Sequence, residues 1–250
     1  MTASVAHLWR HPIKSHGREE LSEVRLHEGQ TVPWDRHWAV AHQAAKTDGG
    51  EWAACANFSR GAKAPALMAI STRLDETTRR VTLTHPDRDP LDFAPDDSPP
   101  EFFDWVRPLM PDDRAASARI VTGPRGMTDS EFASVSIMTL ATHRAVEAAV
   151  GKPLSKVRWR GNIWLDGPAA WSEFDWIGRT LRIGTAELEV RERITRCLAT
   201  TANPDTGQRD ADTLGALQSG WNHRDFGVYG VVTKGGQVRL GDAAVLLWHC

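Results

Sequence analysis

Short segments in which apolar and polar residues alternate, with tight turns between them, fill the carboxyl-terminal half of this chain. Residues 179–190 alternate on both sides of Gly184 and Thr185, which is the pattern of a hairpin with one buried face. Residues 226–232 and 238–247 repeat this pattern. Several short strands with regular turn signals predict that this half of the chain folds as a β-barrel.

Two helices are predicted to interrupt these strands. Ser134 or Ser136 can cap the first helix, and Gly151 is typical of the residue that ends one. Asp212 can cap a second, shorter helix that runs through Leu217. The carboxyl-terminal half is therefore expected to be a barrel with few helices.

The amino-terminal half has the same alternation of strands and turns, followed by a polar break. Residues 85–90 and 94–100 are acidic and proline-rich, so they predict loops, and a helix is expected at residues 101–109. Residues 111–128 are expected to connect the two halves. The strands predicted before the break lie at residues 5–9, 21–26, 38–41, 67–70 and 81–83.

The size and composition predict a mainly β (α+β) fold. A chain of 250 residues can form one large domain or two domains of about 100–150 residues. The net charge is −2, with 30 basic and 32 acidic residues, so no nucleic-acid partner is indicated and any anion site must be a local cluster. No stretch is typical of a signal peptide or a membrane span, so a cytoplasmic protein is predicted.

Three cysteines, Cys55, Cys197 and Cys250, lie far apart, and this odd number argues against a disulfide framework. Cys197 is the most informative of them because it follows Arg196 at the end of an alternating strand. A thiol beside a fixed positive charge is biased towards the thiolate, the form that binds metals and attacks electrophiles. The alternative is a small apolar residue buried near a turn.

Further cations and small hydrogen-bonding groups stand next to predicted strand ends. Lys14 and Ser15 offer an ammonium and a hydroxyl together, and Arg36 lies between tryptophans in the sequence. Arg160 is followed by a glycine, which lets a ligand approach the backbone, and by an asparagine. Each cation alone is typical of a solvated surface. Together with Arg196 they would form a cradle for a phosphate and a heterocycle around a thiol.

Taken in order, these motifs resemble the molybdenum-cofactor sulfurase carboxyl-terminal (MOSC) family. The resemblance is to the amidoxime-reducing branch, which has an amino-terminal MOSC-associated β-barrel domain. It implies a MOSC amino-terminal β-barrel domain at residues 1–115 and a MOSC β-barrel domain with a few helices at residues 116–250. The motifs that carry it are Pro12-Ile13-Lys14-Ser15, Asp35-Arg36, Arg160-Gly161-Asn162-Ile163, Thr195-Arg196-Cys197, Pro204-Asp205-Thr206-Gly207 and Phe226-Gly227-Val228-Tyr229.

The resemblance also implies a site for the molybdenum cofactor, a pterin (molybdopterin) that carries the metal, in a cleft between the two domains. Cys197 is then the metal ligand and the catalytic residue. The expected cofactor contacts are Lys14, Ser15 and Arg36 from the first domain and Ser136, Arg160, Asn162, Thr195, Arg196 and Tyr229 from the second. A soft thiolate suits the metal, and lysine and arginine donors suit a phosphate.

The chain departs from the family pattern at three places. The usual Arg-Pro-Asn is Arg-Gly-Asn here, with Gly161 at the centre. Val135 stands where relatives often carry threonine, so one hydroxyl donor is missing. Ile194 and Thr195 replace the Cys-Pro-x-Cys form before the ligand. These departures make the match of Ser136 the least direct of the set.

The resemblance implies a molybdoenzyme, an oxidoreductase that removes oxygen from N-hydroxylated or other N-oxygenated small molecules and releases water without pyridoxal phosphate. Electrons would come from a separate ferredoxin, flavodoxin or cytochrome-type protein, because the chain carries no ferredoxin-like domain after its last predicted strand. One alternative is a cofactor carrier or a sulfur-transfer protein that holds a persulfide on Cys197. Another is a barrel whose cysteine is inert.

Overall fold

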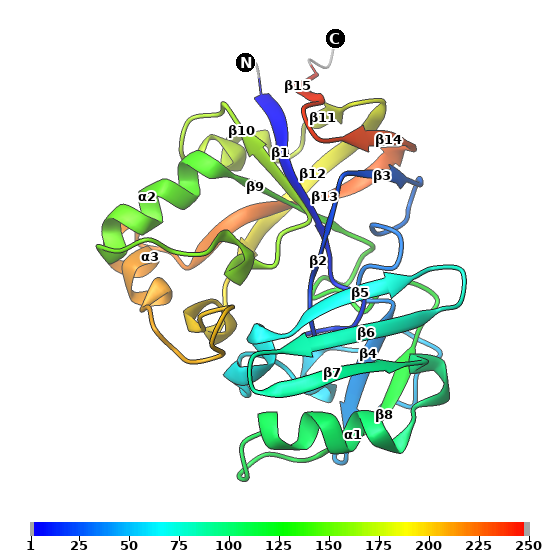
Figure 1. The fold of residues 1–250 in the computed structure, drawn as a ribbon. Helices are drawn as coiled ribbons and strands as arrows, with labels where there is room; N and C mark the ends of the chain where they lie inside the picture. Colours follow the sequence, from blue (N-terminus) through cyan, green and yellow to red (C-terminus); the bar gives the residue numbers. More distant parts are fainter. Residues whose placement is uncertain (1–2, 248–250) are drawn as a thin grey trace.

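The computed structural model describes residues 3–247, and it forms a β-barrel above a second body of smaller sheets (Figure 1). Cys250 lies outside the described residues. Seven strands of an eight-stranded sheet close the barrel, and all neighbours are antiparallel except one parallel pair. In pairing order they are β10 (Ile163–Asp166), β9 (Val135–Thr139), β13 (Asp225–Lys234), β12 (Ala186–Thr195), β11 (Thr180–Ile183), β15 (Ala243–Leu246) and β1 (Ala3–Arg10).

The apolar residues that alternate along the predicted strands are the ones that fill the interior of the barrel. In the β11–β12 hairpin, the apolar residues Leu181, Ile183, Ala186, Leu188 and Val190 are all fully buried, while Arg182, Glu187 and Glu189 are exposed or partly covered. The turn falls at Gly184, whose positive φ of 56° suits glycine. The predicted hairpin and barrel are confirmed, and the fold is mainly β, with three α-helices among the described residues.

The two helices beside the barrel differ in how well they were predicted. Helix α3 (Thr213–Trp221) is capped by Asp212, whose side chain accepts from the Gly215 N–H, as predicted. Helix α2 (Leu140–Val150) ends at Gly151 as predicted, but it begins at Leu140 and is capped by Thr139. The prediction of a cap at Ser134 or Ser136 was wrong because residues 135–139 are buried on both faces and form β9, between β10 and β13.

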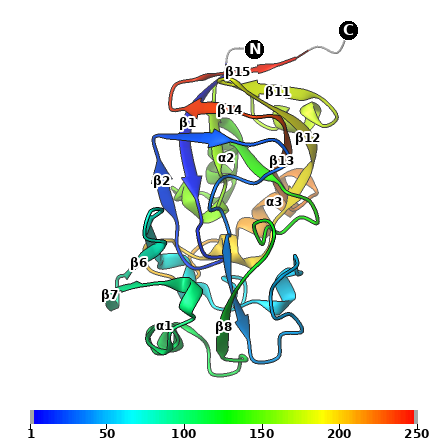
Figure 2. The same cartoon turned by 90° about the vertical axis from the view of Figure 1, so that its right-hand side faces the viewer.

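The second body contains two small sheets and one α-helix. Strand β4 (Trp38–His42) pairs with β8 (Ser117–Thr122), and a three-stranded sheet holds β5 (Ser71–Asp75), β6 (Arg80–His85) and β7 (Arg88–Phe93). Helix α1 (Pro100–Val106), continued by a 3-10 turn to Leu109, closes the base of this body in Figure 2. The predicted helix at residues 101–109 therefore lies where it was expected.

Three predictions in this body were wrong. Residues 67–69 belong to a 3-10 helix (Pro65–Ala69), and Ile70 caps it, so this segment is not a strand. Residues 88–90 belong to β7, which is an edge strand and so can contain a proline. The expected connector at residues 111–128 contains β8. In the second and third cases the local sequence favours a loop, but pairing with β6 and with β4 makes the segment a strand.

The chain crosses between the two bodies near its start. Strand β1 belongs to the barrel, and β2 (Glu19–Leu21) pairs with its far end. Strand β3 (Glu23–Leu26) pairs with β14 (Gly236–Arg239), so sequence from the first half covers the barrel beside its last strands. The division of the sequence at residue 115 stays a prediction. In the described part of the chain, no helix is long and apolar enough to cross a membrane.

One acidic side chain is fully buried where α2 meets the barrel. Glu173 lies in a 3-10 helix (Ser172–Trp176), and Thr139 Oγ1 lies 3.3 Å from both of its carboxyl oxygens. Burial raises the pKa of Glu173 because the charged form loses its hydration. The neutral carboxyl therefore fits this position better than the carboxylate.

We expect Glu173→Gln to gain stability relative to the native chain as the pH rises. The Glu173 carboxyl contributes its full stability at pH values below the pKa that it has in the unfolded chain. This contribution is lost as the pH rises through the raised pKa of the folded state. An amide does not titrate, so its contribution does not change with pH. Urea unfolding between about pH 5 and about pH 8 measures this difference, with the exposed Glu131→Gln reporting the general pH dependence. A free-energy difference that stays constant with pH would contradict the assignment.

Candidate functional site

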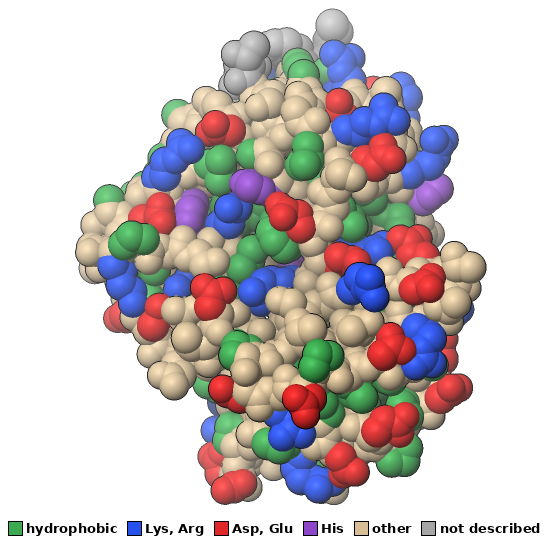
Figure 3. Space-filling view, viewed as in Figure 1, with side chains coloured by type: hydrophobic (Ala, Val, Ile, Leu, Met, Phe, Trp, Pro, Cys, Tyr) green, Lys and Arg blue, Asp and Glu red, His purple; other side chains and the backbone are tan. Residues whose placement is uncertain are grey.

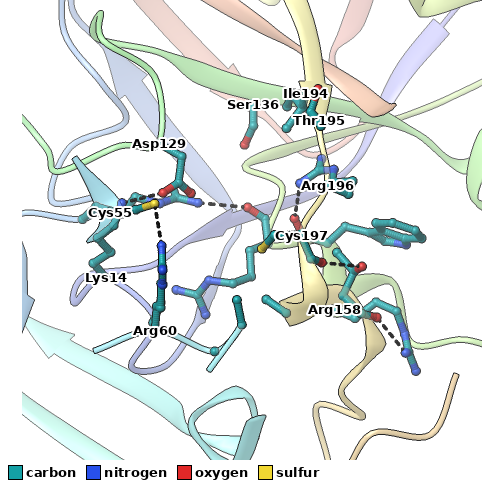
Figure 4. Close-up of a pocket in the computed structure, with 18 of the residues that line it drawn as sticks. Lys14, Cys55, Arg60, Asp129, Ser136, Arg158, Ile194, Thr195, Arg196 and Cys197 are labelled. Atoms are coloured by element: carbon teal, nitrogen blue, oxygen red, sulfur yellow. Dashed lines mark hydrogen bonds and ion pairs between the residues drawn. The ribbon is translucent and has the colours of Figure 1, made fainter. Parts of the chain in front are cut away.

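A cavity of about 230 Å³ is lined by residues from both bodies (Figure 4). On the outer surface, Figure 3 shows lysine and arginine side chains in the hollowed band where the two bodies meet. Nine of the ten predicted site residues line this cavity, although they come from six separate parts of the sequence. They are Lys14, Ser15, Arg36, Ser136, Arg160, Thr195, Arg196, Cys197 and Tyr229.

Cys197 is exposed to the cavity at the end of β12. It occupies the cap position of a 3-10 helix (Leu198–Thr201), and its carbonyl accepts hydrogen bonds from the Thr200 N–H and Oγ1, at 3.2 and 3.1 Å. The turn therefore holds the backbone of Cys197 while its sulfur remains accessible. The alternative of a buried apolar cysteine does not fit this exposure.

The Arg196 side chain anchors the strand end that precedes Cys197. Its guanidinium donates to the carbonyls of Phe226 and Trp159, and it lies over the stacked rings of these residues, whose centroids are 3.9 Å apart. Burial lowers the pKa of Arg196 to about 10. Its hydrogen bonds are made to the protein, so its geometry is that of a residue that positions Cys197.

The lower wall of the cavity comes from the segment that follows β1. Lys14 is buried, and its Nζ donates to the Met127 carbonyl at 2.7 Å and to Asp129 Oδ1 at 2.6 Å. Burial raises the pKa of Asp129, but the charges of Lys14 and Arg36 outweigh burial and lower it to about 2. Asp129 is therefore ionised at neutral pH. Among the described residues that line the cavity it is the one acidic side chain, beside six cations.

Arg36 is held by a buried carboxylate. Its Nη1 donates to Asp35 Oδ2, and Asp35 Oδ1 accepts from the His11 N–H at 2.7 Å and from His11 Nδ1 at 3.0 Å. Burial would raise the pKa of Asp35, but Arg36 and the hydrogen bonds from His11 hold it below its usual range. Burial and the charge of Arg160 lower the pKa of His11 to about 3, so its ring is neutral.

Arg160 brings a second buried guanidinium close to the first. Arg36 Nη2 donates to the Arg160 carbonyl at 3.3 Å, and Arg160 Nη1 donates to the Gly17 carbonyl at 3.0 Å. Burial and the repulsion of Arg36 lower the pKa of Arg160 to about 9. Arg160 Nη2 is buried without a partner among the described residues. An anionic group would relieve both the repulsion and the missing hydrogen bond.

Three of the cavity residues have backbone conformations that side chains rarely adopt. Ser15, Arg36 and Arg160 have φ angles of 63°, 51° and 52°. A left-handed residue other than glycine costs about 1–3 kcal/mol and tends to occur at functional sites. Their gathering in one cavity supports a functional assignment.

Asn162 is the predicted contact that the structure does not bring into the cavity. Its Oδ1 accepts from the Ser136 N–H and Oγ, and its Nδ2 donates to the Trp9 carbonyl, so it ties β9 to β1. The space beside Gly161 is filled by Met138, because a Cβ on Gly161 would lie 2.5 Å from Met138 Cγ. The expectation that this glycine lets a ligand approach was wrong.

Thr195 and Tyr229 face the cavity from neighbouring strands. Thr195 Oγ1 donates to Asp225 Oδ1 at 2.7 Å. Burial and the nearby Asp129 raise the pKa of Tyr229 to about 12, so its hydroxyl stays protonated at neutral pH. Tyr229 pairs with Ser136 across β13 and β9, which places both at the same level of the barrel.

Sequence reasoning missed several residues that line the cavity. Asp129 directly follows the segment that was predicted to be a connector, Cys55 begins a short 3-10 helix (Cys55–Asn57), and Arg60 lies in the loop after it. Arg158 donates to the Thr200 carbonyl at 3.0 Å and to Asp210. One signal was available, because Arg60 is followed by glycine in the same way as Arg160.

The fold and the site define a class of protein: two β bodies that share a cationic cavity around an exposed thiol. The chain belongs to the MOSC family. The family model of the MOSC domain matches residues 124–245, and that of the MOSC N-terminal beta barrel domain matches residues 2–103. The resemblance identified from the motifs is therefore confirmed.

Individual relatives are distant. The chain is 24% identical to mitochondrial amidoxime-reducing component 1 of Mus musculus over 295 residues, which cover 98% of this chain and 82% of the mouse protein. The structure of the YUAD protein from Bacillus subtilis covers 100% of this chain and 98% of its own, with 12% identity and a TM-score of 0.49. That of YiiM from Geobacillus stearothermophilus covers 46% and 54%, with 20% identity and a TM-score of 0.36. Neither structural similarity is close enough to carry an argument.

We expect Asp35→Asn to destabilise the fold by about 3–5 kcal/mol, because it leaves the buried Arg36 without its counter-charge. The Asp35–Arg36 pair stabilises the native state at pH values above the pKa that the aspartate has in the unfolded chain. This contribution is lost as the pH falls through the lowered pKa of the folded state. Urea unfolding at neutral and acidic pH measures both effects. Asp104→Asn removes the partner of Arg107 from an exposed pair and should change stability by about 1 kcal/mol at most. Equal losses in the two variants would contradict the role of burial.

Proposed function

We propose that this protein binds the molybdenum cofactor in the cavity between its two bodies and reduces N-oxygenated small molecules there. The observation that carries the proposal is the convergence of buried cations from both bodies on an exposed thiol, Cys197. Membership of the MOSC family, which is associated with this cofactor, supports it. The name of the mouse relative, an amidoxime-reducing component, supports the type of substrate.

The residues of the cavity fit such a group. The cofactor carries a phosphate, and Lys14, Arg36 and Arg160 offer converging donors, with Arg160 Nη2 still lacking a partner. No group of three or more His, Cys, Asp and Glu side chains that could hold a metal occurs within residues 3–247. A metal brought by an organic cofactor and bound by the single thiolate of Cys197 is consistent with both observations.

The proposed reaction is a two-electron reduction. The N–O bond of an amidoxime breaks, an N–H bond forms, and the oxygen leaves as water after two electrons and two protons have been taken up. The bound cofactor would supply the redox chemistry, and a separate electron-transfer protein would supply the electrons. A two-electron reduction of this kind needs a redox-active cofactor, which the protein's own side chains cannot replace.

The chain's own residues have distinct proposed roles. Cys197 binds the metal, and Arg196 fixes the strand end from which Cys197 projects. Tyr229 Oη holds a proton in the cavity at neutral pH, whereas Asp129 is ionised and orients Lys14. Asn162 acts indirectly by fixing the Ser136 hydroxyl, so we propose it as a positioning residue.

A cofactor carrier or a persulfide-transfer protein is the second candidate, and the exposure of Cys197 favours it. Such a protein would release its cargo, while a reductase retains the cofactor through purification. The three left-handed residues and the buried cations favour retention, because a strained and repulsive site gains most from a permanently bound anion.

We expect protein from a cofactor-producing host to contain close to one molybdenum and one pterin per chain, measured by elemental analysis and by fluorescence after oxidation. Cys197→Ala removes the metal ligand and Arg160→Ala a phosphate donor, so each should lower cofactor retention more than about tenfold. Cys55→Ala removes the other described cysteine of the cavity and should retain the metal. Folded native protein with neither metal nor pterin would refute cofactor binding.

We also expect the loaded protein to convert benzamidoxime to benzamidine when a chemical or protein electron donor is supplied. Product formation by chromatography measures this, and Cys197→Ser should abolish it because a hydroxyl is a poor ligand for a soft metal site. Arg144→Ala, an exposed change on α2, serves as the control. A fully loaded protein that reduces no N-oxygenated compound would favour the carrier.

A further inference from the structure

Arg60 differs from the other cations of the cavity in its partners. Lys14, Arg36 and Arg158 each contact a carboxylate, and Arg160 and Arg196 donate to backbone carbonyls. Within the described residues, Arg60 has no carboxylate partner, and its one hydrogen bond runs from Nη1 to Cys55 Sγ at 3.0 Å. A guanidinium has five N–H donors, so most of those of Arg60 remain available.

The loop that carries Arg60 is fixed beside the turn that follows Cys197. Arg209 Nη2 donates to the Ala62 carbonyl at 2.9 Å, and its Nη1 donates to the Leu198 carbonyl, so one side chain joins the two segments. A Cβ on Gly61 would lie 3.5 Å from Ala199 Cβ, which is ordinary contact. Arg60 is therefore part of the same wall as the segment after Cys197, and its position is set by contacts that do not involve its guanidinium.

The direction of the side chain agrees with this placement. In Figure 4 the Arg60 guanidinium points along the cavity wall towards the Cys55 sulfur, on the side away from Arg158. Gly61, Ala62 and Ala199 also line the cavity, and such small side chains leave room for a flat apolar group. The cavity thus offers a thiol, a small apolar surface and a cation with free donors.

We propose that Arg60 binds a carboxylate of the substrate, so that the preferred substrates are flat N-oxygenated compounds carrying a carboxylate away from the N–O group. This inference rests on the proposed reductase function. A planar guanidinium matches a carboxylate with two parallel hydrogen bonds, and it does so best where water is partly excluded. The hydrogen bond to Cys55 Sγ uses a single N–H of Arg60 and leaves its other donors available for a carboxylate.

Binding without turnover provides the first test. Calorimetric titration of the cofactor-loaded protein, with no electron donor, compares 4-carboxybenzamidoxime with benzamidoxime. We expect the carboxylate to bind at least about tenfold more tightly, as is typical for a charge-assisted bidentate pair. Arg60→Gln should remove this preference, and Arg60→Lys should keep part of it. Lys63→Gln, an exposed charge removal on the same loop, should keep all of it.

Turnover and cofactor content complete the test. With electrons supplied, Arg60→Gln should raise the ratio of KM for 4-carboxybenzamidoxime to KM for benzamidoxime at least about tenfold. Equal binding of the two compounds by the native protein, or a preference that survives in Arg60→Gln, would overturn the proposal. Loss of molybdenum or pterin from Arg60→Gln would also overturn it, because Arg60 would then hold the cofactor. Failure of the reductase function has a different signature: neither compound is reduced, whatever their relative affinities.

Discussion

Closure of the barrel by β1 is the constraint on which the site depends. β1 pairs with β10 on one side and β15 on the other, which removes the free edges of the sheet. Lys14 and Ser15 follow within a few residues of the end of β1, so the same pairing delivers them to the cavity. The first strand therefore connects the fold of the second half to the chemistry contributed by the first.

The cavity is electrostatically unbalanced in the absence of a ligand. Six cations face one carboxylate among its described residues, and burial and mutual repulsion lower the pKa of Arg160. Asp35, which pairs with Arg36, and Asp129, which pairs with Lys14, offset part of this charge. A bound anion would offset the remaining positive charge of the cavity. This would explain why the fold keeps buried cations such as Arg160, whose burial is unfavourable without a partner.

Local patterns in the sequence predicted elements whose burial alternates and failed where burial is complete or pairing is distant. The β11–β12 hairpin and the Asp212 cap were found because their signals are local. β9 was mistaken for the start of a helix because all five of its residues are buried and no alternation remains. β8 lay hidden in a polar segment, since only its pairing with β4 makes it a strand.

The sequence by itself determined the mainly β fold and the family and singled out Cys197 as a candidate, because alternation, turn residues and ordered motifs are properties of the chain. Tertiary structure decided which residues share the cavity. It placed Asn162 outside the cavity as a brace between strands, and it brought Arg60 and Asp129 into it from loops with no motif. The physical reason is that the direction of a side chain and its counter-charge depend on packing between segments far apart in sequence.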